Sequence, residues 1–349
     1  MSFQSIEKNE FDEEKRDFRG LLRDREISAR YNSGMTLTLK QNILDAAVHE
    51  VGFTLAGVAG PEAFDPGRYH DWLDRGYAGS MAYLHRNLEK RFNPSLLIPG
   101  VRSILCVGLN YYQETSESQP AGVGRVSLYA RGADYHRVVR QMLHRLAEKI
   151  RIIRGGDFHY RAFVDSAPVM EKLLAVRAGL GWIGKNGCLV NRHWGSFLFL
   201  GELFVDFEIE PDTPTKNYCG RCRRCIDACP TGAIVAPQTV DARRCVSYLT
   251  IEHRGEIDED LKSKMGHRLF GCDQCQNVCP FNRKCRETLS EEFRRPILGE
   301  SLDPNEILNW DETICKNRTT RSAGERADLQ QWRRNARIVL KNLNPAVPH

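Results

Sequence analysis

Eight cysteines in the second half of the chain have the spacing of iron-sulfur ligands. The segment CGRCRRCIDACP, which starts at Cys219, follows CxxCxxCxxxCP, a pattern in which three close thiolates bind one cluster and the fourth binds another. The segment CDQCQNVCP, which starts at Cys272, is an incomplete copy that lacks one ligand. Cys245 lies between the two segments and can supply it. These residues indicate storage and transfer of single electrons.

The crossed ligand rule of two-cluster ferredoxins assigns each cysteine to a cluster. We expect one [4Fe-4S] cluster to be bound by Cys219, Cys222, Cys225 and Cys279. We expect the other to be bound by Cys229, Cys245, Cys272 and Cys275. Two zinc sites are the alternative, because paired CxxC elements also form four-thiolate sites, but zinc motifs seldom contain the three-thiolate run and the repeated Cys-Pro. Disulfides are not expected, since no signal peptide is recognised and cytosolic thiols stay reduced.

A glycine-rich segment, GLGWIGKNG from Gly179 to Gly187, is the second feature that could do chemistry. It approaches the phosphate-binding pattern GxxxxGK[ST], but Asn186 has no hydroxyl group for magnesium, and a helix rather than a strand is predicted before it. A glycine-capped helix end would explain Gly179 alone. Because glycines remove side chains from a surface, the segment favours a large flat ligand lying against the backbone.

Asp165 lies in the sequence VDSAP, where a predicted strand meets a predicted helix. A carboxyl group at such a position can act as a general acid if burial raises its pKa. The alternative is a helix N-cap, because Asp and Ser are favoured caps and Pro168 suits the first turn of a helix. Taken alone, the residues favour the cap.

Alternating strands and helices are predicted to position these residues in an α/β body. Apolar spacing indicates helices at 37–51, 138–153 and 168–178, and short apolar runs indicate strands at 53–58, 101–109, 161–165 and 197–207. We therefore predict four parts of the chain: a loosely ordered extension at 1–34, an α/β domain at 35–212, a two-cluster domain at 213–290 and a helical basic tail at 291–349.

The composition, with 349 residues, 41% hydrophobic and 27% charged, is that of an ordinary soluble protein with a formal net charge of +5. No apolar stretch approaches the length of a membrane span, so we expect a cytoplasmic protein without membrane contact. From Thr313 onward, eight Lys or Arg stand against two acidic residues. This tail is a candidate for contact with a polyanion or, equally, a solvated helix face.

Four motifs, in this order, resemble those of the epoxyqueuosine reductases. They are VDSAPVMEKLLAVRAGLGWIGKNG, the CxxCxxCxxxCP segment, CVSYLTIEHRG from Cys245, and FGCDQCQNVCPFN. The resemblance extends from about Leu37 to Asn282. It implies an α/β (α+β) fold, with a nitroreductase-like domain that binds cobalamin, a ferredoxin-like domain with two [4Fe-4S] clusters and a short helical tail.

The resemblance also implies a reaction and its partners. The protein would reduce the epoxide of epoxyqueuosine to queuosine at the wobble position of tRNAs for aspartate, asparagine, histidine and tyrosine. Electrons from an unidentified donor would pass through the two clusters to cobalamin, and we expect the protein to act as a monomer. A polyanionic tRNA would also give the basic tail a function.

The same resemblance implies roles for single residues. Asp165 occupies the position of the family's proton donor beside cobalamin, which reverses the preference for a cap. His136 is not expected to bind cobalt, because the sequence after Asp134 departs from the pattern DxHxxG. By motif position, the other candidates for the cobalamin pocket are Gly184, Lys185, Asn186, Ser247 and Arg254.

Two other functions fit part of the sequence. A corrinoid reductive dehalogenase would share cobalamin and the clusters and act on a small molecule, but such enzymes usually carry an export signal. A protein that only transfers electrons would leave the α/β domain and the glycine-rich segment unexplained.

Overall fold

The computed structural model describes residues 38–115 and 122–344, and the predicted extension at 1–34 lies outside them. At its centre is a four-stranded sheet in the order β1-β2-β7-β4, in which every neighbouring pair is antiparallel. Its strands are β1 (Leu55–Ala59), β2 (Ser103–Asn110), β7 (Leu198–Val205) and β4 (Tyr160–Phe163). These bounds confirm the four strands predicted from apolar runs.

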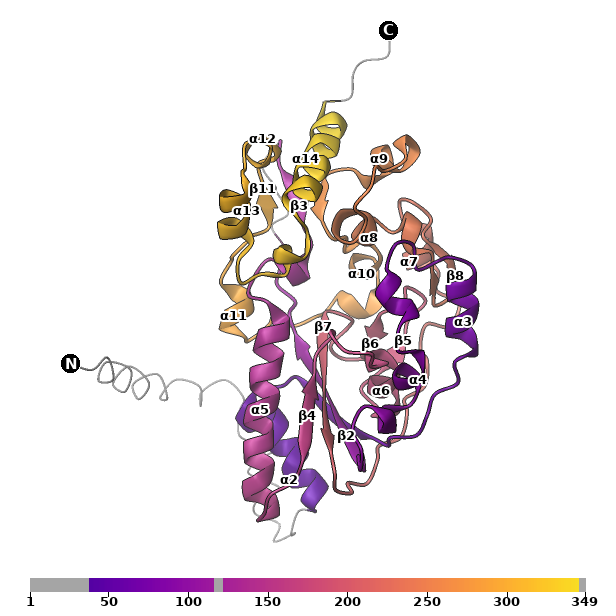
Figure 1. Cartoon of the computed structure of the whole chain (residues 1–349), viewed down its shortest axis with the longest axis vertical. Coiled ribbons are helices and arrows are strands. Elements are labelled where there is room, and N and C mark those ends of the chain that lie inside the picture. The colour runs from indigo at the N-terminus through magenta and orange to yellow at the C-terminus, as the bar shows by residue number, and fades with distance from the viewer. Residues whose placement is uncertain (1–37, 116–121, 345–349) are drawn as a thin grey trace, which may run out of the picture.

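Helices cover both faces of this sheet, as Figure 1 shows. On one face lie α2 (Leu39–Asp45), a π-helical turn (Ala46–Val51) and the long helix α5 (Tyr135–Arg154). On the other face lies α6 (Glu171–Arg177). Because successive residues of a strand point to opposite faces, β2 and β7 contribute side chains to both layers and are almost wholly buried.

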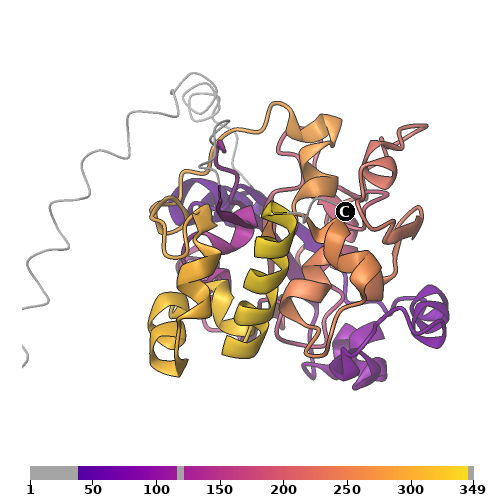
Figure 2. The same cartoon turned by 90° about the horizontal axis from the view of Figure 1, so that it is seen from above.

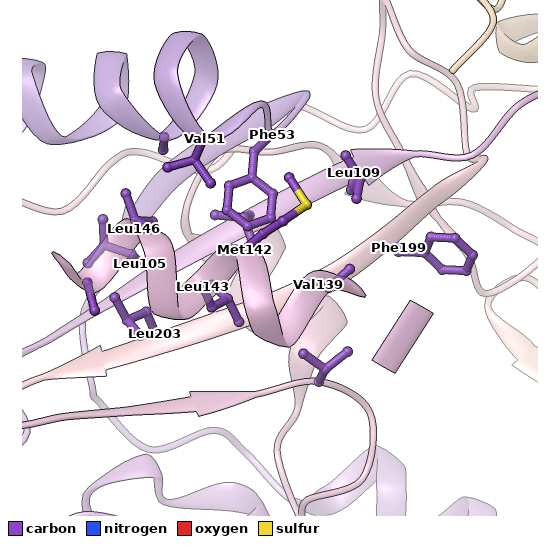
Figure 3. Packing of buried hydrophobic residues seen from close by; sticks show 14 of the residues in the cluster. Val51, Phe53, Leu105, Leu109, Val139, Met142, Leu143, Leu146, Phe199 and Leu203 are labelled. Carbon is purple, nitrogen blue, oxygen red and sulfur yellow. The ribbon is translucent and has the colours of Figure 1, made fainter. Parts of the chain in front are cut away.

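The main hydrophobic core lies between α5 and the sheet. Figure 3 shows Val139, Leu143 and Leu146 of α5 packed toward Leu105 of β2 and Leu203 of β7. The α5 residues recur at spacings of three and four, so they form one apolar stripe, as the sequence predicts. Each wholly buried aliphatic side chain contributes about 1.5–3 kcal/mol. This packing fixes the N-terminal end of α5 at the edge of the site described below.

A second, three-stranded sheet joins parts of the chain that the sequence assigns to different domains. Its strands are β3 (Gly124–Val126), β10 (Arg268–Phe270) and β11 (Ser301–Leu302), in the order β10-β3-β11. They come from the predicted α/β domain, the two-cluster domain and the tail, respectively. The three predicted segments therefore share backbone hydrogen bonds.

The C-terminal helices are part of the folded body: three of them pack at the second sheet, whereas Phe293 of the first lies in the main core. They are α11 (Glu291–Arg294), α12 (Pro304–Leu308), α13 (Glu312–Thr319) and α14 (Leu329–Leu343). Figure 2 shows α14 lying between the other C-terminal helices and the cluster segment. Trp332 of α14 is fully buried and stacks on Phe270 of β10, with ring centroids 5.2 Å apart. Asn335 donates hydrogen bonds to the carbonyl oxygens of Thr250 and Leu269.

Short elements complete the fold around the central sheet. Between β1 and β2 lie α3 (Gly67–Asp74) and α4 (Leu88–Phe92), and after α6 comes the hairpin of β5 (Trp182–Ile183) and β6 (Leu189–Val190). The cluster segment contains α7 (Arg224–Asp227), β8 (Ile234–Ala236), β9 (Thr239–Val240), α8 (Val246–Ile251), α9 (Glu259–Met265) and α10 (Gln274–Asn277). Among the described residues, no helix is both long and apolar enough to cross a membrane.

Candidate functional site

A cavity of about 1570 Å³ lies where the α/β body meets the cluster segment. It exceeds the roughly 300–1,000 Å³ of pockets for drug-sized ligands. Its walls come from the α3–α4 region, the start of α5, the segment before α6, the β5–β6 hairpin and α8. Asp165, Asn186, Ser247 and the cluster cysteine Cys245 all line it. The structure thus brings three candidate residues and one cysteine together around a single space.

Asp165 faces this cavity in a conformation that aspartate seldom adopts. Its φ is 53°, in the left-handed region, and 58% of its side chain is accessible. The Tyr135 hydroxyl donates a hydrogen bond to Oδ2 at 2.6 Å, and Nε2 of His136 lies 3.3 Å from the same oxygen. The Asp165 amide donates to the Glu171 carboxylate. These contacts hold a backbone conformation that costs of order 1–3 kcal/mol.

The N-cap interpretation of Asp165 is wrong. Helix α6 begins at Glu171, so neither Asp165 nor Pro168 lies at its first turn, and its N-cap position is Met170, which makes no side-chain capping bond. The carboxyl of Asp165 is instead available to the cavity. This outcome removes the structural explanation that the sequence favours for this residue.

The neighbours of Asp165 determine the protonation states of Asp165 and His136 through their effect on the two pKa values. The hydrogen bond from His136 lowers the pKa of Asp165. Burial acts to lower the pKa of His136, but the carboxylates of Asp134 and Asp165 outweigh it and raise this pKa to about 9. A group with a raised pKa keeps its proton below that value. At neutral pH, therefore, Asp165 is a carboxylate and His136 is the cation beside it.

Tyr135 and His136 are the site residues that the sequence does not single out as functional. The signal available was the triplet Asp134-Tyr135-His136 at the start of a predicted helix. Asp134 caps α5 by accepting from the His136 amide at 3.0 Å, and its side chain also contacts Nδ1 of His136 at 2.7 Å. The cap thereby fixes the orientation of the imidazole toward Asp165.

The assignment of the eight cysteines to two clusters stays a prediction, and their electrostatic neighbours agree with it. Electrostatic contacts connect Cys225 and Cys279 to one another and to Cys219 and Cys222. Separate contacts connect the other four, which are Cys229, Cys245, Cys272 and Cys275. In the described part of the chain, no three His, Cys, Asp or Glu side chains are arranged as ligands of one metal ion. A four-iron cluster needs a different arrangement, because its thiolates bind separate iron atoms.

N–H groups point at two of these sulfur atoms. The indole Nε1 of Trp182 lies 3.4 Å from Sγ of Cys219, and the Ala233 amide lies 3.2 Å from Sγ of Cys229. Hydrogen bonds to cluster sulfur are one of the ways in which a protein tunes the reduction potential. The donor set and its N–H partners therefore fit two [4Fe-4S] clusters.

The glycine-rich segment contacts both the cluster region and the cavity. Nζ of Lys185 donates to the carbonyl oxygens of Gly220 at 2.7 Å and Cys222 at 2.9 Å, within the first cysteine loop. Gly184 and Lys185 do not line the cavity, whereas the buried Asn186 does. Of the three adjacent candidates, the structure places only Asn186 at the proposed pocket.

The last two candidates, Ser247 and Arg254, lie in different places relative to the cavity. Ser247 lies on α8 and lines the cavity. Arg254 does not line it, because its guanidinium is paired with Asp328 and donates to Oε1 of Gln331 at 2.7 Å. The structure thus places Arg254 outside this cavity, and its assignment to the cobalamin pocket stays a prediction. These contacts of Arg254 could not be predicted from the sequence, because Asp328 and Gln331 lie more than seventy residues further along the chain.

These features define an iron-sulfur oxidoreductase in which two groups of thiolates lie beside one large cavity. Comparison with known proteins agrees. Residues 218–282 match the family model described as 4Fe-4S double cluster binding domain, and residues 91–166 match the one described as Epoxyqueuosine reductase QueG, DUF1730.

Individual relatives extend this agreement over most of the chain. The epoxyqueuosine reductase of Xanthomonas campestris is 44% identical over 300 residues, which cover 84% of each protein. That of Escherichia coli is 41% identical over 310 residues, covering 87% of this chain and 80% of the relative. A crystal structure of epoxyqueuosine reductase with an epoxyqueuosine-modified tRNA-Tyr stem loop is 29% identical, has a TM-score of 0.81 and covers 88% of this chain and 82% of that one. The chain belongs to the epoxyqueuosine reductase family.

Proposed function

We propose that this protein reduces the epoxide of epoxyqueuosine in tRNA to the alkene of queuosine, with electrons passed through two [4Fe-4S] clusters to cobalamin. The observation that carries the proposal is that Asp165 and Cys245 line the same cavity. A proton-handling carboxyl and a cluster ligand thus meet at one place, as reductive removal of an oxygen atom requires.

Cobalamin fits the residues of the cavity. The volume of about 1570 Å³ suits a ligand larger than ordinary small molecules, and aromatic side chains such as Tyr69 and Trp72 line it. Asn186 and Ser247 would hold polar groups of the cofactor from the cluster side. When bound, cobalamin supplies a metal centre that accepts electrons from the clusters and delivers them to the substrate.

Asp165, His136 and Tyr135 would deliver a proton to the epoxide oxygen as it leaves. His136 holds a proton at neutral pH, because its pKa is about 9, and its Nε2 lies 3.3 Å from Oδ2 of Asp165. Transfer along this contact makes Asp165 the acid that faces the cavity. The Tyr135 hydroxyl keeps the carboxyl oriented throughout. In this scheme Asp165 acts as the proton donor while His136 holds the proton between turnovers.

The substrate partner follows from the same reasoning. Figure 1 shows α3 and α4 beside the cluster segment, and Arg68, Arg75, Arg86 and Arg91 of this region line the cavity. Arginine side chains contact phosphates favourably, so this rim suits an anticodon loop. The tRNAs would be those for aspartate, asparagine, histidine and tyrosine, met in the cytoplasm by a monomer that receives electrons from an unidentified donor.

The architecture that we propose for this activity has four parts. A nitroreductase-like domain at 35–212 would hold cobalamin, and a ferredoxin-like domain at 213–290 would hold the clusters. The extension at 1–34 would precede them, and the basic helices at 291–349 would close the chain. The mixed helix and sheet fold and the match at 218–282 support the order of these parts.

The test is turnover by protein purified without oxygen and loaded with iron, sulfide and cobalamin. We expect conversion of epoxyqueuosine to queuosine in tRNA, and we expect Asp165→Asn to lower the rate by about 10²–10⁴-fold, the usual contribution of a general acid. Asp157→Asn, at a carboxyl 98% exposed beyond α5, serves as the control. Absence of turnover in the loaded protein would refute the function, and an active Asp165→Asn would refute only the acid.

The same loaded protein distinguishes epoxyqueuosine reduction from the alternative function, reductive dehalogenation. A reductive dehalogenase would release halide from a halogenated aromatic compound and would leave the tRNA unchanged. The relatives at 41–44% identity are epoxyqueuosine reductases, so the comparisons do not favour this outcome.

A further inference from the structure

A carboxyl group is buried in the middle of the central sheet. Glu202 lies on β7, opposite Cys106 of β2 and Phe163 of β4, and its relative exposure is 0%. Neither carboxylate oxygen has a hydrogen-bond partner of normal geometry among the described residues. Burial, reinforced by the charge of Glu171, raises the pKa of Glu202 well above its usual value. The side chain is therefore a neutral acid within an otherwise apolar layer.

Glu171 connects this buried acid to the site. It is the first residue of α6, lines the cavity and accepts the hydrogen bond of the Asp165 amide. The residue as a whole is half-buried, and protein atoms surround its carboxyl. This burial, with the charge of Asp165, raises the pKa of Glu171 to about 8.

Charged groups from three elements face Glu171. Asp165 belongs to the loop after β4, His136 comes from α5, and Lys172 is its neighbour on α6. The two cations lower its pKa, but burial and the Asp165 carboxylate outweigh them. Glu202 lies beneath, on β7, and is the fourth titratable group of this set.

We propose that Glu171 is a second proton-supplying group of the site and that Glu202 is the positioning residue that supports it from the core. The inference depends on the proposed function, because it concerns the protons of that reaction. The geometry points to it: one carboxyl touches the Asp165 backbone and the cavity, and the other lies behind it without a hydrogen-bond partner in the described part of the chain.

The stoichiometry of the reaction requires a second proton. Reducing an epoxide to an alkene breaks both C–O bonds, forms a C=C bond and releases water, which takes up two electrons and two protons. The clusters supply the electrons, and the pair of Asp165 and His136 supplies one proton. Glu171 supplies the other by passing its proton to the Asp165 carboxylate, which leaves Glu171 ionised until water in the cavity reprotonates it. When Glu171 ionises, the neutral Glu202 beneath it can donate a hydrogen bond to the new carboxylate.

The pH dependence of turnover distinguishes Glu171 from His136. A proton donor with a raised pKa is active below that pKa and inactive above it. For the loaded wild-type protein we therefore expect kcat to begin falling near pH 8, where Glu171 ionises. In Glu171→Gln we expect this limb to disappear, so that kcat is lower by about tenfold at neutral pH and falls only near pH 9, with His136.

Variants of Glu202 test the supporting role. Glu202→Leu removes the hydrogen-bond donor, so we expect the alkaline limb to move to higher pH and kcat to fall. Glu202→Gln keeps a neutral donor of the same size and should restore both. Glu148→Gln, at an exposed carboxyl on α5, is the control. An unchanged limb in Glu171→Gln, or equal behaviour of the two Glu202 variants, would overturn the proposal.

Infrared difference spectroscopy gives a readout that does not need turnover. Protonated carboxyls have a distinct carbonyl band, so we expect one band that titrates near pH 8 and is missing in Glu171→Gln. A second band should persist at higher pH and be missing in both Glu202 variants. If these bands are absent, the roles proposed for Glu171 and Glu202 are refuted, even if the enzyme is active. If all proteins, including the wild type, fail to reduce tRNA, the proposed function falls instead.

Discussion

Arg334 tests whether the basic C-terminal helix serves structure or nucleic acid. Its guanidinium is buried and donates to three carbonyl oxygens, those of Leu249 at 2.6 Å, His253 at 2.7 Å and Gly255 at 2.8 Å. These carbonyls belong to the end of α8 and the loop behind it. Arg334 therefore connects α14 to the segment that carries Ser247 to the cavity.

The magnitude follows from these bonds. A hydrogen bond to a charged group contributes about 1.5–3 kcal/mol, and neighbouring bonds are not additive. Arg334→Met would remove all three bonds, although the His253 carbonyl would keep the hydrogen bond from Nε2 of Gln331. We expect a loss of about 3–5 kcal/mol, less than the full sum of three bonds to a charged group. Arg337→Met, three residues further along the same helix at an exposed position, should change stability by less than about 0.5 kcal/mol.

Hydrogen exchange of the cluster-loaded protein measures this loss locally. Because about 1.4 kcal/mol corresponds to a factor of ten, amides of 246–255 should exchange roughly two to three and a half orders of magnitude faster in Arg334→Met. The same peptide should be unchanged in Arg337→Met. Equal exchange in the two variants would refute the structural role of Arg334, as would faster exchange in both.

Three further predictions concern the clusters, the packing and the tRNA. Cys272→Ser should lose about half of the bound iron, whereas Cys188→Ser, beside the ligand Cys275, should keep it, as measured by iron and sulfide content. Gly57→Ala should destabilise the protein by about 1–3 kcal/mol, because its Cβ would lie 2.2 Å from the carbonyl oxygen of Ala178, just after α6. Gly156→Ala is the control, because its Cβ would meet only the Arg154 side chain at 3.9 Å, and thermal unfolding compares the two. Arg337→Gln should lower the salt slope of tRNA binding by about 1 or less, and an unchanged slope would leave it a solvated residue.

The parts of the fold that the sequence predicts are those that local pattern controls. Helix α5 and the strands of the central sheet follow from apolar periodicity within one element. The two thiolate groups follow from spacing and the crossed rule: Cys219, Cys222 and Cys225 are close in sequence, as are Cys272 and Cys275, and the rule assigns the remaining cysteines. Such features need no knowledge of which distant segments meet.

The parts that could not be predicted depend on distant contacts. Asp165 meets Tyr135 and His136 because α5 and β4 pack together, and no spacing rule connects residues thirty positions apart. Glu202 reads as one polar residue in an apolar strand, and its relation to Glu171 exists only once α6 covers that face. The small sheet β10-β3-β11 is likewise invisible to a division of the chain into consecutive domains.

In the basic tail, the number of charged residues does not show which side chains are buried, whereas the helical spacing of the buried positions does. In α14 the buried positions include Gln331, Asn335 and Ile338, a helical spacing of three and four, and Arg334 falls within that stripe. Its charge is thus used inside the protein, and Lys341 is paired with Glu259 of α9. These two basic side chains are therefore engaged within the protein. The arginines of the α3–α4 rim, which no net charge of the tail would reveal, are then the stronger candidates for the phosphates of the substrate.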